Sequence, residues 1–188
     1  LSVFESLTRA VSEAPDLAHK ADLSLVAGEA LAKHHGMVEI LRQLKVEPAV
    51  AMQPFTDDID RFESLTVGRD WYETLLGVYL TSSFLNEFFL ALAGSLKKKQ
   101  RETVQEILST DRTGEVLASA IRAGIEADPK LASRLAMWGR RLMGDTQLVA
   151  RSALRLSGDG SEESRLEPVF TDLMGSHSKR MDALGLTA

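Results

Sequence analysis

The sequence contains no cysteine among its 188 residues. This absence excludes disulfide bonds, thiolate metal sites and cysteine nucleophiles, and it fits the reducing cytoplasm, where we expect the protein to reside. An excess of positive charge is absent as well. The formal net charge is −5, so the composition does not favour a broad basic surface for nucleic acid.

Long apolar runs are also lacking. A membrane helix needs roughly 18 to 20 consecutive apolar residues, whereas the longest apolar region, residues 75–92, is interrupted by hydroxyls, Asn86 and Glu87. The N-terminus shows no basic start followed by an apolar core, so it does not read as a signal peptide. It opens directly into helical periodicity without a Met. We therefore expect no membrane association, and a first helix that begins before Leu1.

Strand signals are nearly absent, because no Val, Ile and Thr alternation is flanked by Asn-Gly or Asp-Gly turns. Apolar residues recur at helical spacing almost throughout. The pattern predicts helices over residues 1–12, 16–45, 70–92, 101–127, 129–156 and 164–184, with a short helix or turn between Pro48 and Pro54 and a further segment at 57–65. Asp70 and Asp128 are expected N-caps, the latter followed by Pro129 at the first helical position.

The four middle helices are long, and their connections are short to medium. Such helices favour an antiparallel bundle. The sequence thus predicts an all-α protein that folds as an antiparallel four-helix bundle. The shorter first and last helices are expected at the ends or the flank of this bundle. No repeat and no long linker divides the chain, so we expect residues 1–188 to form a single domain.

Several segments resemble one known family. They are Ala51-Met52-Gln53-Pro54-Phe55, Asp70-Trp71-Tyr72-Glu73, the stretch from Ile121 to Pro129, the run RLAMWGRRLMG from Arg134 to Gly144, and the tail from Ser176 to Leu186. In order and spacing they resemble the actinobacterial ferritin-like proteins related to the tRNA hydroxylase that acts on a hypermodified adenosine. The resemblance extends over nearly the whole chain, and it implies a ferritin-like bundle.

The resemblance also implies a carboxylate-bridged di-iron site inside the bundle. Such sites take a Glu-x-x-His pair from each of two helices and a single carboxylate from each of the other two. The family pattern places these ligands at positions that carry other residues here: Ala30 and Lys33, Thr110 and Thr113, and Ser82. The acid of the first helix would fall at or before Leu1. The di-iron ligands are therefore predicted to be lost.

The histidines allow a check that does not depend on the resemblance. The residues three positions before the four histidines are Asp16, Leu31, Ala32 and Met174, so the chain contains no Glu-x-x-His. Only Asp16 and His19 resemble a metal-binding pair, and they lie at a helix start. The sequence therefore predicts no bound metal, no cofactor and no catalytic residue.

Lys33 shares the inner stripe of the second predicted helix with Ala30 and Met37. Its amine could extend along the apolar stem to solvent. Alternatively, its charge could replace that of the lost metal and pair with an acid of the fourth predicted helix. Asp111 is the first candidate for that acid, with Glu106 and Glu115 as the others.

Two functional hypotheses of different classes follow. One is a metal-free, non-catalytic bundle that serves as a scaffold or binds a partner or a small molecule, the latter in an apolar pocket left by the lost metal site. The alternative is a di-iron oxygenase or hydroxylase related to the tRNA hydroxylases, and only the resemblance supports it. The basic run 97–99 is typical of a solvated turn rather than a nucleic-acid contact. The sequence identifies no partner, and a homodimer through the phenylalanines of residues 84–89 stays open.

Overall fold

The computed structural model describes residues 1–109, 112–156 and 162–187. Of these residues 86% are helical and none lies in a strand, which confirms the all-α prediction. The elements in chain order are α1 (Ser2–Glu13), α2 (Leu17–Gln43), α3 (Pro48–Met52), the 3-10 turn η1 (Gln53–Phe55), α4 (Thr56–Thr66), α5 (Trp71–Ala93), α6 (Lys98–Ser109), α7 (Thr113–Ala127), α8 (Lys130–Leu156) and α9 (Glu162–Ala183).

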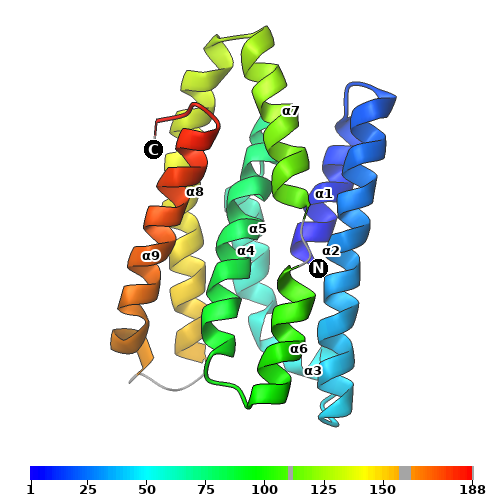
Figure 1. The fold of residues 1–188 in the computed structure, drawn as a ribbon, viewed down its shortest axis with the longest axis vertical. Coiled ribbons are helices and arrows are strands. Elements are labelled where there is room, and N and C mark those ends of the chain that lie inside the picture. Colours follow the sequence, from blue (N-terminus) through cyan, green and yellow to red (C-terminus); the bar gives the residue numbers. More distant parts are fainter. Residues whose placement is uncertain (110–111, 157–161, 188) are drawn as a thin grey trace.

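Helix α5 runs through the middle of the molecule (Figure 1) and packs against α1, α6, α7, α8 and α9. Leu75 and Leu76 in its second turn are fully buried. As predicted, Asp70 caps the helix, since its carboxylate accepts the Glu73 backbone N–H at 3.0 Å. Within the described part of the chain, α5 alone is long and apolar enough to cross a membrane, yet 56% of its apolar window is buried in the bundle. This burial is typical of a core helix.

Helices α1, α2, α5 and α7 form the bundle, because α1 and α7 each pack on both α2 and α5. Helices α8 and α9 cover α5 on the side away from α2 (Figure 1). The sequence predicted that the first helix would lie at an end or flank. In the structure α1 lies along both α2 and α5, and its Leu7 and Ala10 are completely buried, so it belongs to the core.

The fourth predicted helix, residues 101–127, consists of two helices in the structure. Helix α6 ends at Ser109 and α7 begins at Thr113. Ser, Thr and Gly are weaker helix formers than Ala or Leu, and Ser109, Thr113 and Gly114 surround this point. The break between α6 and α7 places the start of α7 at mid-height in the bundle, near the N-terminus of the chain (Figure 1).

Helix α9 buries a histidine whose titration should be visible in the stability of the protein. His177 is 6% exposed, and burial, assisted by the charge of Arg180, lowers its pKa below the ordinary value of 6.5. Below about pH 6.5 this histidine is therefore protonated to a greater extent in the unfolded chain than in the folded one. We expect this histidine to reduce the free energy of unfolding as the pH falls, by at most about 1.4 kcal/mol per pH unit.

Urea denaturation at about pH 7.5 and about pH 5.5 measures this loss. The variant His177→Gln should lose less stability than wild type between the two pH values. His35→Gln is the matched control, because His35 is exposed on α2. Equal losses for wild type and His177→Gln would contradict the prediction.

Candidate functional site

Four of the positions that the resemblance assigned to metal ligands line one pocket inside the bundle. Ala30 and Lys33 are three residues apart on α2 and therefore share one face of that helix. Ser82 comes from α5 and Thr113 from the start of α7. The pocket has a volume of about 330 Å³. Thr110, the fifth position, lies outside the described residues.

The remaining walls of this pocket, which we call the bundle pocket, are mainly apolar. Helices α1, α2, α4, α5 and α6 all contribute to them. The other lining residues are Leu1, Ser2, Val3, His34, Met37, Ile59, Leu85, Asn86, Phe89 and Leu108. Ser82 and Thr113 are 6% and 3% exposed, whereas Leu1, Ile59 and Phe89 are exposed. The pocket thus has a buried end at the two hydroxyls and an apolar mouth.

The donor atoms of the bundle pocket do not suit a di-iron centre. Iron in such centres is held by carboxylates and imidazoles. Among the lining residues the structure describes, none is Asp or Glu, and His34 supplies the only imidazole. Burial lowers the pKa of His34. No cluster of three or more His, Asp or Glu side chains within the described ranges is arranged to share a metal ion.

An ion pair connects α2 to the start of α7 beside the pocket. Arg112 donates from Nε to Oε1 of Glu29 at 2.8 Å, and its backbone N–H donates to Oε2 at 3.3 Å. Glu29 precedes Ala30, and Arg112 precedes Thr113. Sequence reasoning missed this pair, because the two residues are 83 positions apart and no local pattern connects them.

The predicted pairing of Lys33 cannot be read from the described residues. Its first candidate partner, Asp111, lies outside them, so the charge-replacement hypothesis stays a prediction. The other two candidates, Glu106 and Glu115, are exposed on α6 and α7. Lys33 itself is half-buried on the wall of the pocket.

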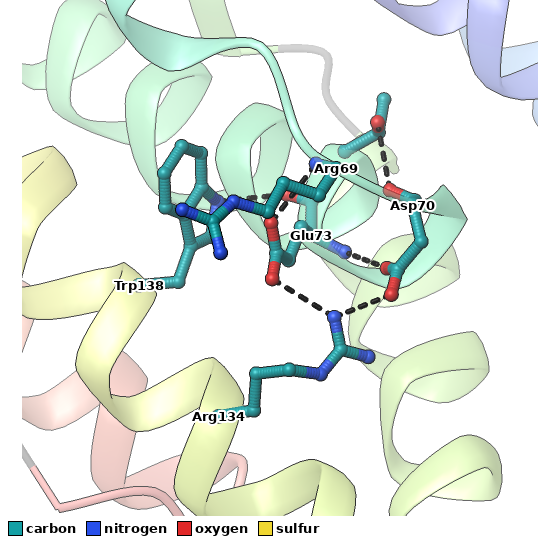
Figure 2. Close-up of polar contacts among 6 residues, drawn as sticks. Arg69, Asp70, Glu73, Arg134 and Trp138 are labelled. Carbon is teal, nitrogen blue, oxygen red and sulfur yellow. Dashed lines mark hydrogen bonds and ion pairs between the residues drawn. The ribbon is translucent and has the colours of Figure 1, made fainter.

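A second polar cluster joins α5 to α8, and Figure 2 shows its members. Arg134 on α8 donates to carboxylate oxygens of both Asp70 and Glu73, the latter at 2.8 Å. Glu73 is only 4% exposed. It also accepts the Arg69 backbone N–H at 2.9 Å, and its backbone carbonyl accepts the Trp138 indole N–H at 3.1 Å. The cluster therefore connects two of the segments on which the family resemblance was based.

We assign this cluster a structural role. Each carboxylate in it already has an arginine partner and a backbone partner, which leaves little capacity for a ligand. It fixes the start of α5 against the N-terminal third of α8. Trp138 is packed in the core, where it is 9% exposed. Arg140 donates to the Thr187 carbonyl at 2.8 Å, and Arg141 forms an ion pair with Asp145 at 3.8 Å.

Other residues singled out in the sequence have structural roles. The Asp16 carboxylate caps α2 by accepting the His19 backbone N–H at 2.9 Å, and it also lies 2.8 Å from the ring nitrogen Nδ1. These hydrogen bonds lower the pKa of Asp16. The lysines of residues 97–99 are exposed as predicted, but Lys98 and Lys99 form the start of α6 rather than a turn. Phe84 and Phe88 are buried in the core, whereas Phe89 reaches the pocket mouth.

Comparison with known proteins identifies one family. Residues 1–159 match the family described as "Ferritin-like domain, actinomycetes". No curated protein matches the chain. The match spans the bundle helices α1, α2, α5 and α7, and therefore all the described walls of the bundle pocket.

Proposed function

The chain belongs to the actinomycete ferritin-like domain family, and on this premise we propose that it is a metal-free, non-catalytic bundle that binds a small organic molecule in the bundle pocket. One observation carries the proposal. Four of the positions that the resemblance assigns to di-iron ligands line a pocket of about 330 Å³ with mainly apolar walls. Small-molecule pockets typically measure about 300 to 1,000 Å³ and combine apolar walls with a few polar groups.

The chemistry of the lining residues supports this role over oxygen chemistry. Ala30, Lys33, Ser82 and Thr113 offer no carboxylate and no imidazole, and an ammonium repels a metal cation. A hydroxylase related to the tRNA hydroxylases would need the ligands that these positions lack. We therefore infer that the di-iron site has been lost.

Metal analysis tests the first half of the proposal. Protein produced in iron-supplemented medium should contain far less than one equivalent of iron, manganese or zinc per chain, because the donor set does not suit these metals. Elemental analysis by mass spectrometry measures this content. An authentic di-iron protein produced in parallel is the control.

Iron bound at about one or more equivalents per chain would overturn the proposal if it occupied the pocket. The variant Ala30→Phe distinguishes pocket iron from surface iron, because its ring would fill part of the cavity. Iron that this variant removes was bound inside the bundle, and the protein would then be a metalloprotein. Iron that remains in the variant is bound elsewhere and leaves the proposal standing.

A further inference from the structure

We propose that the bundle pocket takes a single-chain fatty carboxylate, with the carboxylate head at Lys33 and the alkyl tail at the apolar mouth. This inference rests on the proposed function and specifies the chemical class of its ligand. It depends on the charge of the lining residues, on their burial and on an adjoining apolar groove.

The head-group assignment follows from the polar side chains that line the pocket. Lys33 is the one charged side chain among the described lining residues, and none of those residues is an acid. An ammonium carries three donors, so a contact with another side chain leaves donors for a ligand. The hydroxyls of Ser82 and Thr113 line the same pocket. Charge complementarity therefore favours an anionic head over a cationic one.

The tail assignment follows from apolar side chains that the fold leaves exposed. Ile59 and Phe89 are 37% and 47% exposed at the mouth of the bundle pocket. A second groove, of about 450 Å³, shares Leu1 and Ile59 with it and continues along α3 and α4. Its walls add the exposed Met52 and Phe55. These exposed apolar side chains line two adjoining pockets, and an alkyl chain would cover them.

The charges of the second groove determine the orientation of the ligand. Its lining includes three acids, Glu5, Asp60 and Glu63. These carboxylates would repel an anionic head, whereas the bundle pocket offers Lys33. The head is therefore assigned to the bundle pocket, and the tail extends through the shared mouth toward α3 and α4.

Isothermal titration calorimetry of the wild-type protein with three ten-carbon probes tests the head group. Decanoate, decanol and decyltrimethylammonium share one chain and differ in charge. The two charged probes are used below their micellar concentrations, and decanol is used below its solubility limit. Decanoate should bind with about one equivalent per chain and at least about tenfold more tightly than the other two, because a hydrogen bond to a charged group is stronger than one between neutral groups.

Variants locate the site. Lys33→Met should weaken decanoate about tenfold and leave decanol unchanged, so that the two bind alike. Lys99→Met is the matched control, since Lys99 is exposed on α6 outside the pocket. Ala30→Phe should abolish binding of both probes while circular dichroism shows an intact helical protein.

The outcomes separate the two proposals. Equal affinity for decanoate and decanol in the wild type, with both lost in Ala30→Phe, would overturn the carboxylate assignment but support the small-molecule function. Preference for decyltrimethylammonium would overturn the carboxylate assignment as well. Binding that Ala30→Phe leaves unchanged would place the site elsewhere, and absence of binding by every probe would overturn both proposals. The wild-type probe series decides the head group even if Lys33→Met does not fold.

Discussion

Replacing Arg134 with methionine should lower the free energy of unfolding by about 3 kcal/mol, because the change leaves a buried carboxylate without its counter-charge. Glu73 is 4% exposed, and its Oε1 accepts from Arg134 at 2.8 Å. Removing one partner of a buried ion pair costs about 3 to 5 kcal/mol. We place the effect at the lower end, because Arg134 is 40% exposed and the Arg69 backbone N–H remains bonded to Glu73.

Replacing the acidic partner of this ion pair should destabilise the protein less. Glu73→Gln retains the side-chain shape and leaves Arg134 paired with Asp70, so we expect a loss of about 1 kcal/mol. Urea denaturation followed by circular dichroism measures both variants. Arg61→Met is the matched control, since Arg61 is exposed on α4, and it should change stability by less than about 0.5 kcal/mol. A loss for Arg134→Met no larger than that of Glu73→Gln would show that the buried carboxylate does not depend on the arginine.

Features of the fold that depend on neighbouring residues could be read from the sequence. Helix starts at Asp16 and Asp70 were predictable, because a capping carboxylate bonds a backbone N–H only three positions away, and the structure shows both bonds. The predicted helices match most of the observed ones because apolar side chains repeat at the helical period. The position of α1 was missed, since periodicity shows that a helix has an apolar face but not which helices cover it.

Contacts between distant segments could not be derived from one sequence. Glu29 pairs with Arg112, and Asp70 with Arg134, across 83 and 64 positions, and charge alone does not select these partners among the many acids and bases. The boundary between α6 and α7 was missed for a different reason. Apolar residues continue at helical spacing on both sides of residues 110–112, and the weak helix formers there were outweighed in the prediction by that periodicity.

The bundle pocket could be predicted from the sequence only in part. The family resemblance placed Ala30, Lys33, Ser82 and Thr113 at one level of the bundle, and the structure brings them to a single cavity. The apolar mouth was not predicted, because Ile59 and Phe89 belong to α4 and α5 and meet only in the folded chain. A motif can thus locate the centre of a site, whereas its shape depends on packing.

Replacing Gly68 with alanine should reduce the free energy of unfolding by about 3 kcal/mol, the second large effect that we expect. Gly68 lies in the connection between α4 and α5. A Cβ at this position would lie 2.4 Å from the Thr74 backbone nitrogen and 2.7 Å from the Glu73 carbonyl carbon. Backbone atoms of a helix cannot rotate away as a side chain can. The connection would have to move, which would also displace the Arg69 N–H from Glu73.

Gly28→Ala is the matched control for this change. Gly28 lies within α2, is exposed, and has no atom within 4 Å of the position its Cβ would take. Alanine is favoured over glycine inside a helix by about 0.5 to 1 kcal/mol, so this variant should be more stable than wild type. The same substitution should therefore change stability in opposite directions at the two sites in one urea-denaturation experiment. A neutral Gly68→Ala would mean that the start of α5 tolerates displacement, and that the Glu73 cluster does not fix it against α8.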